Sequence, residues 1–224
     1  MRSLTVNLDL TGSKALVLGC GKVGLRKLSR LLGTGAEITA VEPRPSPELL
    51  RLERAGAITL LESFSPELLE GARLVFAASG EGVPREVLEA ARAGRILLNS
   101  ADEPGLGTFA LPAVAEDGAL TVSVSTGGAF PALSAVLAAR LRESFRGWGG
   151  YVELLGSLRS RVLASPLPAR ERSGILRRLA EDPELPELVR SGRRPEAMRL
   201  AAGLLSPVDL PPDTALPGFP KDAS

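Results

Sequence analysis

Short apolar runs alternate with amphipathic segments along the first half of the chain. The apolar runs predict five strands, at Ala15–Leu18, Glu37–Val41, Ile58–Leu61, Leu74–Ala78 and Ile96–Leu98. Helical patterns follow the first four strands, from the glycine-rich turn to Gly33, over Pro47–Arg54, from Ser65 to Gly71 and over Val83–Ala93. Regular alternation of strands and helices is typical of the α/β class, so this half is predicted to form a doubly wound parallel sheet.

Further apolar patterns flank this predicted sheet. Leu4–Leu10 alternates apolar and polar residues, which predicts an edge strand. After Asn99 the pattern predicts strands at Thr108–Pro112, Ala113–Ala115 and Ala119–Ser125, with a tight hairpin turn at Asp117-Gly118. Helices are then predicted from Pro131 to Phe145, ended by a break at Gly147–Gly150, over Tyr151–Leu163, Glu171–Leu179 and Pro183–Arg190, and from Pro195. The proline-rich tail from Ser206 has no periodicity, which predicts disorder.

A glycine-rich turn joins the first predicted strand to the helix after it. Residues 19–24 (GCGKVG) fit G-x-G-x-x-G in the strand–turn–helix context that makes this motif informative. Gly19 would form the tight turn, Gly21 would let the backbone approach a pyrophosphate, and Gly24 would let helix and strand pack. The N-terminus of the helix would hold the phosphates. The motif predicts a dinucleotide site of the Rossmann type; the alternative is a turn that packs in this way without a ligand.

Two further positions extend this predicted site. Glu42 ends the second strand, roughly 20 residues beyond the glycines, where a carboxylate that binds ribose hydroxyls belongs. It favours NAD⁺, whereas Arg44 nearby offers a partner for the 2′-phosphate of NADP⁺. Ser79 follows the fourth strand at the edge where such sheets bind their ligands. We therefore predict NAD as the cofactor, with Glu42 and Ser79 among its contacts.

Composition narrows the chemistry that this site can use. The chain has no histidine and one cysteine, so His-based triads and the common zinc sites are excluded. The residues left for general acid–base catalysis are Asp, Glu and Lys side chains, Cys20 and Tyr151. Cys20 lies inside the glycine turn, where a bound phosphate would oppose a thiolate, so we interpret it as a small turn residue. No metal-binding residues are predicted.

Charge and hydropathy bear on partners and location. The formal net charge of +1 gives no argument for a nucleic-acid or membrane partner, and an aromatic content of 4% leaves few side chains for base stacking. No apolar run is long enough to span a bilayer, and the first residues lack the apolar core of a signal peptide. With one cysteine, these features predict a cytoplasmic protein. The stretch from Arg140 to Arg199 is locally basic, which solvated helix faces and an anion-binding surface both explain.

Three segments, GCGKVGLRK, NSADEPGLGTF and STGGAFPAL, occur in this order and together resemble the precorrin-2 dehydrogenase family, the sirohydrochlorin-forming part of siroheme synthase. The resemblance covers roughly Leu4 to Arg146. It implies a homodimer that oxidises precorrin-2 to sirohydrochlorin with NAD⁺, and in some members insertion of Fe²⁺. It also implies an N-terminal Rossmann domain at 1–112, a central α+β dimerisation region at 113–146 and a helical C-terminal domain at 147–205, followed by the tail at 206–224.

The resemblance also assigns residues to the site. The family's essential aspartate lies in an Asn-x-x-Asp-x-Pro loop, which is Asn99, Asp102 and Pro104 here. The chain departs from the family at Ala129-Phe130, where small polar residues are usual, and at Thr126, which stands for a serine that some members phosphorylate. Cofactor contacts carry over to Gly19, Gly21, Lys22, Val23, Gly24 (often Ala in the family), Pro43 and Arg44.

The residues themselves favour Asp102 as the catalytic group. Dehydrogenation releases a proton, and in a chain without histidine a loop carboxylate beside the nicotinamide is the natural acceptor. Glu103 is the alternative base, and a cap of the loop before Pro104 is the alternative role of Asp102. The competing functions are an NAD-sensing Rossmann regulatory module without catalysis and a dehydrogenase of another small substrate. Iron insertion stays open, because no ligand cluster is visible.

Overall fold

A computed structural model describes residues 4–206 and residue 208 of the chain. The chain divides into two compact units, one over Ser3–Leu111 and one built on Pro112–Ser224. Each unit has its own hydrophobic core.

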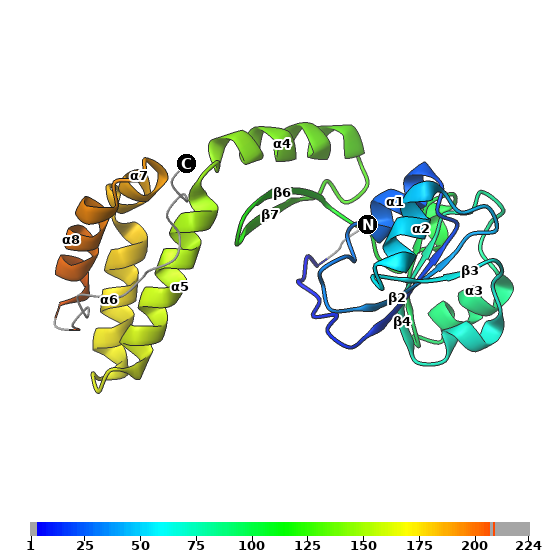
Figure 1. Ribbon diagram of the computed structural model, residues 1–224, viewed down its shortest axis with the longest axis horizontal. Coiled ribbons are helices and arrows are strands. Elements are labelled where there is room, and N and C mark those ends of the chain that lie inside the picture. Colours follow the sequence, from blue (N-terminus) through cyan, green and yellow to red (C-terminus); the bar gives the residue numbers. More distant parts are fainter. Residues whose placement is uncertain (1–3, 207, 209–224) are drawn as a thin grey trace. The chain divides into compact units, whose positions relative to one another are not determined.

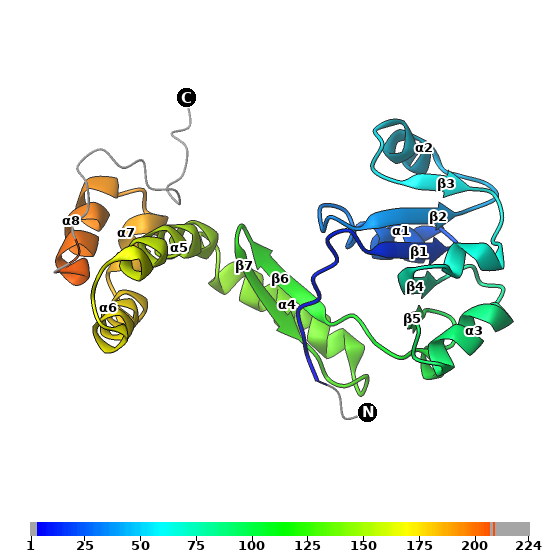
Figure 2. The same cartoon turned by 90° about the horizontal axis from the view of Figure 1, so that it is seen from below.

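The first unit is built on a five-stranded parallel sheet with the strand order β3-β2-β1-β4-β5, which Figure 2 shows from one side. The strands are β1 (Lys14–Leu18), β2 (Glu37–Val41), β3 (Thr59–Leu61), β4 (Ala72–Ala77) and β5 (Leu97–Ser100). Leu18, the last residue of β1, pairs with Val41 of β2 and Ala77 of β4. The carboxyl ends of these strands therefore meet at one edge, where doubly wound sheets bind their ligands.

Helices cover both faces of this sheet (Figure 1). They are α1 (Lys22–Leu28), α2 (Pro47–Arg54) and α3 (Arg85–Arg92), with the short 3₁₀ helices η1 (Pro66–Leu69) and η2 (Pro104–Leu106). Leu28 of α1 and Leu49 of α2 are buried with Phe76 on one face, whereas Val87 of α3 is buried with Leu98 on the other. Burial on both faces explains why the strands are nearly continuous apolar runs. The predicted α/β class and doubly wound parallel sheet are confirmed.

Three local expectations for this unit are wrong. Leu4–Leu10 forms no strand and pairs with none of the five strands of the sheet, and Leu4 is 87% exposed. Thr108–Pro112 is not a strand either, although the N–H groups of Thr108 and Phe109 donate to the carbonyl of Leu98. An alternating pattern indicates an extended segment, but strand pairing needs a neighbour that the pattern does not supply. Helix α1 ends at Leu28 and gives way to turns before Gly33.

The second unit begins with a hairpin of β6 (Ala113–Asp117) and β7 (Leu120–Val124). Gly118 occupies the first position of its two-residue turn with a φ of 53°, which a glycine adopts without strain. Helix α4 packs against both strands. After the hairpin, the rest of the second unit is helical, and the predicted helical C-terminal region is confirmed. The helices of this unit are α4 (Pro131–Ser144), α5 (Trp148–Ala164), α6 (Ala169–Glu181), α7 (Leu185–Arg190) and α8 (Arg194–Leu205).

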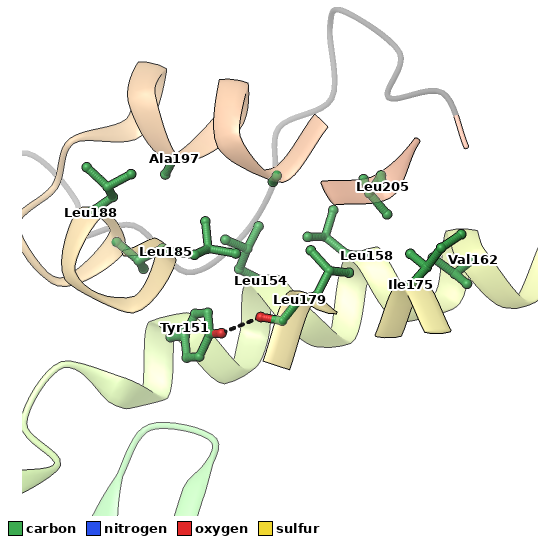
Figure 3. Close-up of a cluster of buried hydrophobic side chains, with 12 residues drawn as sticks. Tyr151, Leu154, Leu158, Val162, Ile175, Leu179, Leu185, Leu188, Ala197 and Leu205 are labelled. Atoms are coloured by element: carbon green, nitrogen blue, oxygen red, sulfur yellow. Dashed lines mark hydrogen bonds between the residues drawn. The ribbon is translucent and has the colours of Figure 1, made fainter. Parts of the chain in front are cut away.

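Helices α5 to α8 enclose a leucine-rich core (Figure 3). Leu154 and Leu158 of α5 are fully buried among residues of the other three helices, such as Leu185 and Leu205. The hydroxyl of Tyr151 donates to the carbonyl of Leu179 at 2.7 Å, so the polar end of this buried ring has a partner.

One expectation for the second unit needs correction. Helix α4 ends at Ser144, Gly147 has a left-handed φ of 82°, and α5 already begins at Trp148, so the break does not extend to Gly150. Helix α4 is only partly covered on its apolar side, because Leu133 is 45% and Val136 49% exposed. Apart from Ser206 and Val208, the predicted tail lies outside the described residues. None of the helices in the described part of the chain is long and apolar enough to cross a membrane.

Candidate nucleotide-binding and catalytic site

The glycine turn between β1 and α1 is packed tightly at two of its glycines and open at the third. Gly19 has a φ of 80°, and a Cβ there would lie 2.3 Å from the Cα of Ser79. A Cβ on Gly24 would lie 1.9 Å from the carbonyl oxygen of Gly19. By contrast, a Cβ on Gly21 would meet no atom within 4 Å. The turn therefore leaves space beside Gly21, where a pyrophosphate needs to approach the backbone, so its shape fits the predicted dinucleotide.

Glu42 holds this turn from the end of β2. Its carboxylate accepts the N–H of Cys20 at 2.8 Å through one oxygen and the N–H of Arg44 at 3.2 Å through the other. The carboxylate is thereby fixed beside the glycine turn. Pro43 and Arg44 are exposed next to it, and Lys22 and Val23 are exposed at the start of α1. Val23 is 42% exposed, so it is not part of the buried helix face that contains Leu28.

Cys20 has the properties of a structural residue. Its side chain is 3% exposed. Burial, and secondly the charge of Glu42, raise the pKa of the Cys20 thiol to about 12. The side chain therefore stays a protonated thiol at neutral pH and is a poor nucleophile, as expected for a small turn residue.

Asp102 lies in the loop that follows β5. One of its carboxylate oxygens accepts the N–H of Gly80, in the loop after β4, at 3.0 Å. Since Ser79 in that same loop abuts Gly19, the structure brings Asp102, the β4–α3 loop and the glycine turn to one edge of the sheet. Glu103 follows Asp102 in the chain and donates its own N–H to the hydroxyl of Ser100 at 3.1 Å.

Hydrogen bonds close the neck of this loop. Leu98 donates its N–H to the hydroxyl of Thr108 at 2.9 Å, and the N–H of Thr108 returns a bond to the carbonyl of Leu98 at 2.8 Å. The side-chain amide of Asn99 donates to the carbonyl of Phe109 at 3.0 Å. Residues 100–107 therefore form a closed loop on a fixed base, and Asp102 lies within it.

Lys27 is the residue at this site that the sequence reasoning missed. It lies on α1, partly buried, and donates to the side-chain oxygen of Asn99. Its ammonium lies 5.5 Å from the ring centre of Phe76. Burial, and secondly the charge of Arg26, lower the pKa of Lys27, while Asp102 acts in the opposite direction. The only sequence signal for Lys27 was its position on the helix that follows the glycine motif, five residues after Lys22.

The STGG turn belongs to the second unit. The hydroxyl of Thr126 accepts the N–H of Phe130 at 3.1 Å and lies 3.2 Å from the hydroxyl of Ser134, which is buried. Thr126 thus organises the start of α4. Across residues 4–206 and 208, no three carboxylate or thiol side chains gather as a metal site would require.

Comparison with known proteins agrees with this geometry. Residues 6–113 match a family described as putative NAD(P)-binding. The siroheme synthase of Nitrosospira multiformis is 37% identical over 169 residues, which is 72% of this chain and 36% of that protein. Siroheme synthase 3 of Aeromonas hydrophila is 32% identical over 209 residues, or 92% of this chain and 45% of that protein. The chain thus spans less than half the length of these curated relatives.

A solved structure described as SirC, precorrin-2 dehydrogenase, has the same fold. Its TM-score is 0.71 at 23% sequence identity, and the match covers 89% of this chain and 98% of that one. The resemblance to the siroheme synthase family predicted from three short segments is therefore confirmed: residues 6–113 match a family described as putative NAD(P)-binding, and the chain is similar to curated siroheme synthases over 72% and 92% of its length.

Proposed function

We propose that the chain is an NAD⁺-dependent dehydrogenase that converts precorrin-2 to sirohydrochlorin in siroheme biosynthesis. The observation that carries this proposal is the position of Asp102. Its carboxylate lies at the same sheet edge as the open glycine turn, in a relative of the siroheme synthases. A base and a nucleotide site at one edge are the two parts that a dehydrogenation needs.

The chain's own residues then have distinct tasks. The backbone beside Gly21 would hold the pyrophosphate, and Glu42 would accept the ribose hydroxyls. When bound, NAD⁺ supplies the acceptor for the hydride that leaves the macrocycle. Asp102 takes up the proton that leaves with it, so the hydride and the proton are both accounted for. Its bond to the N–H of Gly80 orients the carboxylate while leaving a second oxygen for the substrate.

A direct assay tests the activity and the role of Asp102 together. Purified protein is mixed anaerobically with enzymatically generated precorrin-2 and NAD⁺, and the visible spectrum is followed. We expect sirohydrochlorin from the wild type, a loss of about 100-fold or more in kcat for Asp102→Asn, and near-normal turnover for the matched variant Glu103→Gln. Near-normal turnover by Asp102→Asn would remove Asp102 from the mechanism. NAD⁺ binding without any turnover would instead favour the sensor module.

Cofactor choice is tested separately. We propose NAD⁺ over NADP⁺, because the fixed carboxylate of Glu42 would repel a 2′-phosphate. We expect a higher kcat/KM for NAD⁺, and we expect Gly21→Ala to weaken NAD⁺ binding in calorimetry while keeping the fold, because its Cβ enters only open space. A clear preference for NADP⁺ would overturn this role of Glu42. Adding Fe²⁺ to the finished reaction tests metal insertion.

A homodimer through α4 and a cytoplasmic location complete the proposal. The outer side of α4 presents Phe130 (62% exposed), Leu133 and Val136 to solvent, and a partner helix would cover such an apolar strip. Sedimentation of the wild type should give the dimer mass, and Val136→Glu should give the monomer. A monomeric wild type would contradict this arrangement.

A further inference from the structure

The ammonium of Lys27 makes a specific set of contacts inside the first unit. It donates to the side-chain oxygen of Asn99 on β5 and lies 5.5 Å from the ring centre of Phe76 on β4. Phe76 and Asn99 are register partners, so both side chains project from the same face of the sheet, toward α1. Lysines usually place the ammonium in water, because partial burial disfavours its charge. The partly buried position of this ammonium therefore needs a functional or structural explanation.

Asn99 connects Lys27 to the base of the Asp102 loop. It is 7% exposed and uses both ends of its amide, the oxygen for Lys27 and the nitrogen for the carbonyl of Phe109. Asn99 stands three residues before Asp102, and Phe109 stands just after the loop. The ammonium requires an oxygen and the carbonyl requires an N–H, so the two contacts fix the orientation of this amide.

The helix that carries Lys27 is also the helix that begins at the glycine turn. We propose that Lys27 is a positioning residue: through Asn99 it locks the Asp102 loop to the cofactor helix α1, so that the base is held in register with the bound dinucleotide. The kinetic part of this inference rests on the proposed function. The structural part, that Lys27 orders residues 100–109, does not.

The electrostatics of the site agree with this role. Burial lowers the pKa of Lys27, whereas the negative charge of Asp102 favours the ammonium. The two charges attract each other across the loop base, so both the contact through Asn99 and this attraction draw the loop toward α1. A neutral side chain at position 27 would lose both effects, and an arginine would keep the charge and a donor.

Three variants separate positioning from stability. Lys27→Met removes the charge at similar volume, Lys27→Arg keeps the charge, and Arg92→Met removes an exposed charge from α3 as the matched control. With precorrin-2 and NAD⁺, we expect Lys27→Met to lower kcat about 100-fold, the order expected when a reacting group is misplaced. The KM for NAD⁺ and its dissociation constant in calorimetry should stay close to those of the wild type. Lys27→Arg should recover part of kcat, and Arg92→Met should behave as wild type.

Hydrogen exchange supplies a readout that does not depend on activity. In Lys27→Met the amide of Glu103, which is bonded within the loop, and the amide of Thr108, which is bonded at its base, should exchange at least about tenfold faster. In Arg92→Met they should not change. Wild-type exchange at these amides in Lys27→Met would overturn the proposal, as would a kcat that recovers fully on cooling below a lowered melting temperature. If the wild-type chain does not turn over precorrin-2, the proposed function fails, and the exchange experiment still decides whether Lys27 orders the loop.

Discussion

Cys20 shows how its surroundings set the chemistry of a single residue in the glycine turn. Burial and Glu42 raise its thiol pKa from an ordinary 9.0 to about 12. It is the only cysteine in the chain, so a thiol reagent reports on this position alone. At pH 8 we expect iodoacetamide to modify the native protein at least about 100-fold more slowly than the protein unfolded in urea, because the thiolate is the reactive form. Mass spectrometry of timed samples measures both rates, and comparable rates would contradict the burial of Cys20.

The raised pKa of Cys20 makes the free energy of unfolding depend on pH above about pH 9. The folded state keeps its thiol proton up to about pH 12, whereas the unfolded chain loses it near 9.0. This contribution to stability is therefore complete below pH 9 and declines as the pH rises above it. A Cys20→Ala variant should lack that part of the decline, which urea titrations at pH 8 and pH 10 can resolve.

At the scale of elements, the contact between α5 and the β6–β7 hairpin depends on one glycine. The N–H of Gly149, in the first turn of α5, donates to the carboxylate of Asp117 at 2.8 Å. A Cβ at Gly149 would lie 2.2 Å from the carbonyl oxygen of Asp117. Gly156, on the same helix, is exposed and has nothing within 4 Å of a Cβ. The two glycines thus lie on the same helix but differ in their contacts.

We therefore expect opposite signs for two alanine substitutions in α5. Gly149→Ala should lower the free energy of unfolding by about 2 kcal/mol, because the overlap with Asp117 outweighs the gain in helix propensity. Gly156→Ala should raise it by about 0.5–1 kcal/mol, because alanine loses less backbone freedom on forming the helix. Urea unfolding followed by circular dichroism compares them. Stabilisation by both substitutions would show that the hairpin moves aside at little cost.

Local sequence patterns predict those strands and helices whose burial leaves a periodic pattern in the sequence. The strands of the parallel sheet and the helices from Pro131 onward were found because burial on two faces, or on one helical face, leaves a continuous signature. Leu4–Leu10 was misassigned because its alternation says nothing about a pairing partner. The predicted break after α4 is too long because it includes Gly149, which lies inside α5. Only the fold shows that Gly149 is a glycine because of its contact with Asp117.

The same distinction applies to the site. The glycine turn is contiguous in sequence, and its packing at Gly19 and Gly24 follows the expected pattern. Lys27 was missed because its partner Asn99 is 72 residues away. No spacing rule links a helix lysine to a strand asparagine across such a separation, so only the fold reveals the contact.

At the scale of the whole molecule, the cores of the two units share no residue. The buried side chains on the two faces of the parallel sheet lie between Leu10 and Leu98, whereas the helical core lies between Tyr151 and Leu205. The first unit thus buries its own apolar residues and carries the whole glycine turn, Glu42 and the Asp102 loop. Domains of this size with their own core commonly fold alone.

We accordingly expect a chain of residues 1–111 to fold cooperatively and to bind NAD⁺. Its urea transition should be single and sigmoidal, and calorimetry should give a dissociation constant for NAD⁺ within about fivefold of that of the full chain, since no proposed contact to the dinucleotide lies beyond Leu111. Gly21→Ala in this shortened chain controls for nonspecific binding and should weaken the signal without unfolding the protein. A shortened chain that folds yet fails to bind would mean that residues beyond Leu111 complete the nucleotide site. One that does not fold would mean that the parallel sheet needs the second unit for its stability.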